Sequence, residues 1–155
     1  SITADNCSGK MELRTSGGSL TLTTLQGNVD ARTSGGSVRA DNVKGDLVAH
    51  TSGGSVNLKN LSGSVDASTS GGGVHVELTE LGDYVKISNS GGNVDVTMPG
   101  NKGLDLKISG DRINTGTLKN FSRKLDEHEV DGKVNGGGIP VTIRSSSGRI
   151  SLSLE

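Results

Sequence analysis

A short phrase that returns every 18 residues constrains this chain more than any other feature. "TSGGSL" begins at Thr15, "TSGGSV" begins at Thr33 and again at Thr51, and "TSGGGV" begins at Thr69. The whole unit is clearest in residues 27–44, and the units on both sides align with it without a gap. Fixed self-similarity of this length is typical of a solenoid, in which each repeat forms one turn and packs against its neighbours.

Apolar and polar residues alternate within each unit. Val29 and Ala31 alternate with Asn28, Asp30 and Arg32, and the segment after the glycines repeats this pattern. A period of two indicates β-strands, and a unit this short has no room for a crossover helix. Equivalent strands must then stack in parallel, with rungs about 4.8 Å apart. The sequence therefore predicts an all-β, single-domain parallel β-helix, right-handed, with about 18 residues per rung.

Residues at the same place in successive units are apolar, and we expect each set to form a buried stack. The three sets are Met11, Val29, Leu47 and Val65; Leu20, Val38, Val56, Val74 and Val94; and Cys7, Leu25, Val43 and Leu61. The threonines of the repeated phrase have the same inward parity, so their hydroxyls should bond to one another or to the backbone of the corner. The glycines fit a corner that needs positive φ or that leaves no space for a Cβ atom.

The repeat divides the single domain, residues 1–155, into three parts. Residues 1–81 are expected to form regular rungs, residues 82–138 irregular rungs, and residues 139–155 a closing rung. One extra residue in 74–81 and another in 82–87 predict bulges. Residues 104–115 are expected to form the next rung along the stack.

Residues 116–131 interrupt the pattern. Leu118, Phe121 and Leu125 lie at helical spacing, with Thr117 as a candidate N-cap and Gly132 as a candidate stop. This spacing predicts a short amphipathic helix that covers a side or an end of the coil. An irregular charged loop is the alternative.

Charge and hydropathy exclude some partners. The 155 residues include 16 basic and 17 acidic ones, so no overall field attracts nucleic acid or an anionic membrane. No apolar run approaches the roughly 18 residues of a membrane span, so we expect no direct insertion of this domain. The sequence starts at Ser1 in the middle of a repeat. We therefore expect a longer precursor, with a removed signal or lipoprotein leader or another domain upstream.

No cofactor or metal site is expected. Cys7 is the only cysteine, it lies in an inward column, and we expect a structural thiol. His50, His75 and His128 do not have the spacing of three metal ligands. The acidic cluster at 126–129 could bind a cation weakly, but a solvated charge cluster is the favoured explanation.

A calcium-binding β-roll also has 18 residues per turn, but it needs an aspartate in every glycine-rich turn. Asp41 occupies the ligand position once, whereas Thr23, Lys59 and Glu77 occupy it in the other units. The sequence thus does not predict calcium binding.

We expect no enzymatic activity. A carbohydrate-active β-helix enzyme needs clustered carboxylates in a cleft and aromatic rings for sugar stacking. Tyr84 and Phe121 are the only aromatic residues, and no serine lies in a nucleophile motif. This class of enzyme is the least favoured of the functions considered.

Three motifs together resemble a known family. The repeated "TSGGSV" with "GxVxA" is followed by "ISGDRIN" from Ile108 and by "VNGGGIPVTIRSSSGRISL" from Val134. Over nearly the whole chain this arrangement resembles a bacterial family labelled adhesin, a β-strand-repeat domain of unknown function. The resemblance implies a β-helix in the cell envelope, at the periplasmic or extracellular surface, usually behind a signal or lipoprotein leader. It implies no catalytic residues.

Two functions remain after these exclusions. The first is a noncatalytic interaction module that binds a surface polysaccharide or protein through polar side chains in register on its outer face. The candidate binding residues are Glu12, Arg14, Asp30, Arg32, His50 and Asp66. The alternative is a self-assembling scaffold of the bactofilin type, in which bare end rungs associate end to end.

Overall fold

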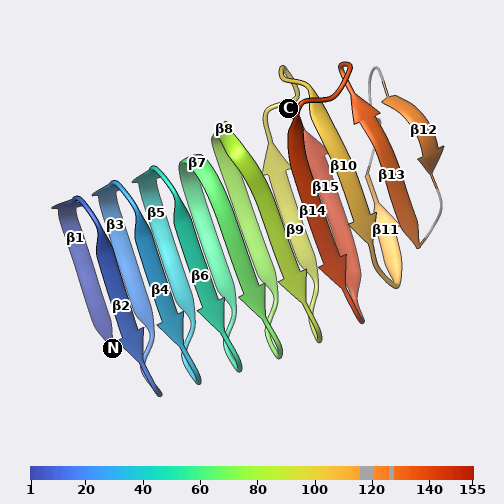
Figure 1. Ribbon diagram of the computed structural model, residues 1–155. Coiled ribbons are helices and arrows are strands. Elements are labelled where there is room, and N and C mark those ends of the chain that lie inside the picture. Colours follow the sequence, from blue (N-terminus) through green and yellow to red (C-terminus); the bar gives the residue numbers. More distant parts are fainter. Residues whose placement is uncertain (116–120, 126–127) are drawn as a thin grey trace.

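The chain forms a flattened coil of β-strands, shown in the computed structural model of Figure 1. The structure describes residues 1–115, 121–125 and 128–155, and this part of the chain contains no helix. The strands are β1 (Ile2–Ser8), β2 (Met11–Thr15), β3 (Leu20–Gln26), β4 (Val29–Thr33), β5 (Val38–Lys44), β6 (Leu47–Thr51), β7 (Val56–Thr69), β8 (Val74–Asn89), β9 (Val94–Met98), β10 (Leu104–Ser109), β11 (Arg112–Asn114), β12 (Phe121–Leu125), β13 (Glu129–Val134), β14 (Ile139–Ser145) and β15 (Arg149–Leu154).

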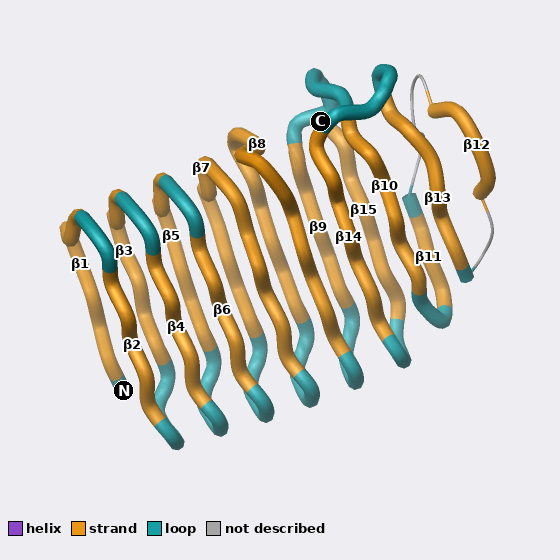
Figure 2. Tube along the Cα trace, viewed as in Figure 1, coloured by secondary structure: helices purple, strands orange, loops and turns teal. Residues whose placement is uncertain are grey.

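Each turn of the coil contributes one strand to each of two layers (Figure 2). The first layer contains, in spatial order, β1, β3, β5, the first halves of β7 and β8, β9, β15 and β11. The second layer contains β2, β4, β6, the second halves of β7 and β8, β14, β10, β13 and β12. The predicted all-β parallel coil with 18 residues per rung is confirmed, because Val38 pairs with Val56 and Val29 with Leu47.

The inward columns form the core between the two layers. Val38, Val56 and Val74 are at most 1% exposed and are partners in adjacent strands. The predicted column through Leu25, Val43 and Leu61 is also confirmed, and these side chains are at most 2% exposed. The described core consists of aliphatic side chains, mainly Val, Leu, Ile and Ala.

The two extra residues of β8 enter the strand at one place. The register offset falls to 17 at Leu61–Leu78, is 18 again at Gly63–Leu81, and reaches 20 at Val65–Val85. Both extra residues therefore enter between Leu81 and Val85, so the extra residue predicted within 74–81 is wrong. The inserted segment includes Asp83 and leaves the turn in phase, because Thr69 pairs with Asn89.

The order of the last rungs in space differs from their order in the sequence. β14 pairs in parallel with β8 on one side and with β10 on the other, while β15 pairs with β9 and β11. The segment at the end of the sequence is thus inserted between two earlier rungs (Figure 1). The prediction that residues 104–115 form the next rung along the stack is therefore wrong. The sequence pattern could not show this, since any strand with the same inward apolar residues can pack and pair against the preceding rung.

A β-hairpin replaces the predicted helix. β13 pairs antiparallel with β10, and β12 pairs antiparallel with β13. Val130 and Val134 extend the core at 1% exposure, and β13 satisfies the backbone groups at the edge of β10. Phe121 and Leu125 belong to β12, so the predicted helix is wrong for these two residues. Thr117 and Leu118, which the helix prediction also used, lie outside the described residues.

Threonine side chains fix the corner between the second layer and the next strand of the first. The hydroxyls of Thr33, Thr51 and Thr69 donate to the carbonyls of glycines in the previous rung, at 2.7–2.8 Å. Each hydroxyl also accepts from the amide of the glycine three residues later in its own corner, at 3.3–3.4 Å. The expected bond to the corner backbone is confirmed, and it links each rung to the one before it.

The second glycine of each of these corners is required by contact between rungs. A Cβ atom on Gly54 would lie 2.2 Å from the carbonyl oxygen of Gly36, and Gly36 and Gly72 are similarly crowded. By contrast, a Cβ atom on Gly53 would come no closer than 3.5 Å to another atom. The two adjacent glycines therefore have different structural roles.

We expect Gly54→Ala to destabilise the fold by about 2–3 kcal/mol, because the rung must move away from its neighbour. Gly53→Ala is the matched control and should change the free energy of unfolding by less than about 1 kcal/mol. Urea denaturation followed by circular dichroism measures both. Equal losses in the two variants would contradict the contact assigned to Gly54.

The opposite corner contains a column of residues in the left-handed conformation, which the repeat did not reveal. Asn6, Asn42 and Asn60 have φ of 52°, 58° and 51°, and Thr24 takes the same place with φ of 52°. Asparagine tolerates this region, whereas a β-branched residue is strained there.

Thr24→Asn should therefore stabilise the protein by about 1 kcal/mol, because it relieves backbone strain. The measurement is the urea midpoint at unchanged slope, and Asn42→Thr should shift it in the opposite direction. A lower midpoint for Thr24→Asn would show that the threonine side chain has a favourable contact that outweighs the strain.

The first rung leaves its inward side chains partly uncovered. Cys7 pairs with Leu25 as predicted, but its side chain is only half-buried, as are Ile2 and Met11. Its Sγ lies 3.3 Å from the carbonyl oxygen of Asp5. The predicted column is thus confirmed for Cys7, and within the described chain β3 covers its side chain from one side.

Cys7 should thus react with a soluble disulfide reagent in the native protein faster than a buried thiol. The control is Val43→Cys in a Cys7→Ser background, which places the thiol in the same column at a site 1% exposed. Stopped-flow or colorimetric labelling of both proteins gives the two rates. Equal, slow rates would indicate that the first rung is covered in solution.

Candidate functional site

The six candidate binding residues lie together on the outer surface of the second layer. Glu12, Asp30 and Asp66 belong to one outward column, with Val48 between the two aspartates. Arg14, Arg32 and His50 belong to a second column, two residues further along each strand. The strands β2, β4, β6 and β7 hold these side chains in register because the backbone ladder between them is continuous.

Ion pairs within this group neutralise much of its charge. Arg14 Nη2 lies 2.7 Å from Glu12 Oε1, and Arg32 Nε donates to Asp30 Oδ1 at 2.8 Å. The hydrogen bond and the charge of Asp30 raise the pKa of Arg32 above its already high value. Exposed pairs of this kind contribute little to stability. They do fix the guanidinium groups in a regular row.

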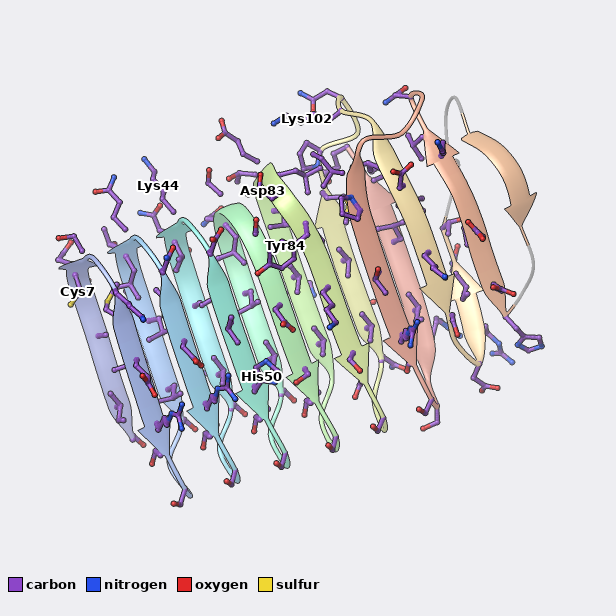
Figure 3. The ribbon with its side chains drawn as sticks, in the orientation of Figure 1. Cys7, Lys44, His50, Asp83, Tyr84 and Lys102 are labelled. Carbon is purple, nitrogen blue, oxygen red and sulfur yellow. The ribbon has the colours of Figure 1, made fainter. Side chains whose placement is uncertain are left out.

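His50 connects the row to the next rung. Its Nδ1 is hydrogen-bonded to Ser68 Oγ at 2.5 Å, and its Nε2 lies 3.7 Å from Asp66 Oδ1. The imidazole, labelled in Figure 3, thus contacts two side chains of β7. A protonated ring would gain a favourable interaction with the aspartate.

Beyond β7 the same two columns contain no acidic residue on β8, β14 and β10, and they contain three cationic ones. The first continues through Lys86, Thr142 and Lys107 on β8, β14 and β10. The second continues through Ser88, Arg144 and Ser109 on the same three strands.

Sequence reasoning missed this group, because β14 reaches its place only through the inserted rung. Residues 140–154 align position for position with residues 28–42 of the repeat. This alignment predicts that Arg144 faces outward, but it does not predict which side chains lie beside it.

Tyr84 stands at the bulge of β8 on this side of the molecule (Figure 3). Partial burial raises the pKa of its phenol, and the nearby charges of Asp46, Asp66 and Asp83 add to that shift. The backbone amide of Asp83 donates to Ser64 Oγ at 2.8 Å, so the bulge is anchored to the previous rung.

The remaining histidines lie apart from this surface. His75 is on the first layer, with Nε2 3.8 Å from Glu77, and His128 Nδ1 lies 2.7 Å from the carbonyl oxygen of Asp111. Within the described ranges no three His, Cys, Asp or Glu side chains gather in a way that could hold a metal ion. The acidic cluster proposed at 126–129 lies partly outside those ranges.

A depression of the surface lies over β13, β10 and β14. It is lined by Asp105, Lys107, Asp131, Lys133 and Thr142, among others. Asp105 Oδ1 is buried there without a hydrogen-bond partner in the described part of the chain. Such a surface suits contacts spread over several strands.

The amino-acid sequence of the whole coil was compared with known protein families. The pattern of the family Toastrack DUF4097 matches residues 2–153. The chain belongs to the Toastrack family. This family is a domain of unknown function with a β-solenoid-like fold, in agreement with the structure. No curated protein and no solved structure matches the chain. Among the described residues there is no helical segment with the length and hydropathy of a membrane span.

Proposed function

We propose that this Toastrack domain is a noncatalytic interaction module of the cell envelope, an adhesin-type module that binds an extended polysaccharide along the outer surface of its second layer. The observation that supports the proposal is the pair of outward columns, which stay in register from β2 to β10. A flat, rigid row of charged and hydroxyl side chains suits repeated weak contacts with a repetitive partner. Summed over several rungs, such contacts reach a useful avidity.

The two ends of the coil make the scaffold alternative less favourable. End-to-end association of this kind needs a parallel rung at each end of the coil. At the end opposite to β1 and β2, the second layer terminates in the antiparallel strands β13 and β12, and the first layer terminates in the short strand β11. A head-to-tail stack therefore lacks a second rung of the same form.

Binding to an array of envelope polysaccharides tests the proposal. The native domain is compared with Arg14→Ala/Arg32→Ala, and Arg39→Ala on the first layer is the matched control. We expect the double variant to lose most of the signal and the control to retain it. Binding that is absent in the native domain, or unchanged in the double variant, would overturn the assignment of this surface.

A further inference from the structure

The inserted rung creates a group of three cations on the outer surface of the second layer. Lys86 on β8 and Lys107 on β10 lie on either side of Thr142 of β14. Arg144 lies two residues further along β14, between Ser88 and Ser109. The three cationic side chains are exposed. Strands that are distant in the sequence thus contribute to one small area.

These cations are available for a ligand. In contrast to Arg14 and Arg32, none of the three forms an ion pair with a described residue. Adjacent strands are about 4.8 Å apart, so Arg144 lies roughly 8 Å from each lysine at the level of the backbone. The long side chains can therefore converge on one group above Thr142.

The geometry points to a binding site for a single compact oxyanion, a phosphate or sulfate ester, formed by Lys86, Lys107 and Arg144. A guanidinium fork and two ammonium groups match the several oxygens of a tetrahedral anion. The hydroxyls of Ser88, Ser109 and Thr142 add hydrogen-bond donors of the right kind. This inference deepens the proposed function, because it gives the bound polymer an anionic substituent.

The acids beside the group limit what can bind. Asp66 is the partner of Lys86 on β7, and Asp131 is the partner of Lys107 on β13. These carboxylates would repel a continuous anionic surface, such as a charged membrane or a nucleic acid backbone. A discrete ester on an otherwise neutral chain avoids them.

Titration of the labelled domain with inorganic phosphate, followed by amide chemical shifts at constant ionic strength, tests the site. We expect saturable shifts confined to β8, β14 and β10, whereas chloride should give none. Glycerol phosphate and a sulfated monosaccharide then distinguish phosphate from sulfate esters. Shifts that match those with chloride, or that lie elsewhere on the molecule, would overturn the proposal.

Variants test the three side chains directly. Lys86→Gln, Lys107→Gln and Arg144→Gln should each weaken phosphate binding roughly fivefold, and the triple variant should abolish it. Arg39→Gln on the first layer is the control and should leave phosphate binding unchanged, and thermal melts verify that each variant is folded. Unaltered binding in the triple variant would contradict the site.

The outcome is separable from that of the proposed function. Phosphate binding without any polysaccharide binding would support the oxyanion site and oppose the polymer proposal. Polysaccharide binding that depends on Arg14 and Arg32, without phosphate binding, would do the reverse.

Discussion

A chain that ends at Gly138 should lose cooperative unfolding and most of its strand signal in circular dichroism. Removal of β14 and β15 leaves β8, β9, β10 and β11 each without one of their partners. It also removes Ile143 and Ile150 from the interior of the stack, where both are fully buried. Because each rung is stabilised mainly by its neighbours, a gap in the middle separates the coil into two parts.

A deletion of the same type at the other end is the matched control. A chain that begins at Ser19 lacks β1 and β2, which pair only with β3 and β4. It should keep a cooperative transition at a lower midpoint, because only an end rung is lost. Similar melting curves for the two truncated chains would contradict the inserted position of the final rung.

The connections around the insertion support this expectation. The amide of Gly100 donates to the carbonyl of Glu155 at 2.7 Å, and the amide of Glu155 donates to the carbonyl of Met98 at 3.0 Å. The end of β15 is thus bonded to the segment that leads from β9 to β10. The hydrogen bonds secure the rung inside the stack.

The regular rungs could be predicted from the sequence because period, parity and column identity all follow from self-alignment. Val56 is inward in every unit that aligns with it, and a parallel stack is the only way to bury all of these residues together. The inward direction of Thr51 follows from the same parity.

The order of the last rungs could not be predicted by this reasoning. Val141 aligns with Val29, which shows that it faces inward, but an inward valine fits equally well against Val85 or at the end of the stack. The backbone hydrogen bonds between adjacent strands likewise do not depend on which side chains the neighbouring strand carries. Only the full set of connections selects the neighbour, and the repeat contains no information about them.

The candidate site likewise contains residues that could be placed from the sequence and residues that could not. Arg14 and Arg32 lie in regular rungs, so their common column could be found by counting. Lys86 follows the bulge, and Arg144 and Lys107 meet through the inserted strand, so no fixed spacing relates them. Their grouping is a property of the topology.

Val56→Asp should destabilise the fold by about 4 kcal/mol or more at neutral pH, because it places a charge in a dry column. Val56 is 1% exposed and lies between Val38 and Val74, so the introduced carboxylate has no polar partner in its column. Asn57→Asp is the matched control, since Asn57 faces outward on the next position of the same strand. Its effect should be within about 0.5 kcal/mol.

The loss in Val56→Asp should also depend on pH. Burial favours the neutral acid, so the pKa of the introduced carboxyl rises in the folded state above its unfolded value of about 3.9. The folded state then binds more protons than the unfolded state, and stability falls as pH rises from the unfolded pKa through the folded pKa. The difference from the native protein should therefore be smallest in acid and largest near neutrality. Urea denaturation at several pH values measures it, and a small loss that does not vary with pH would mean that position 56 is in contact with water.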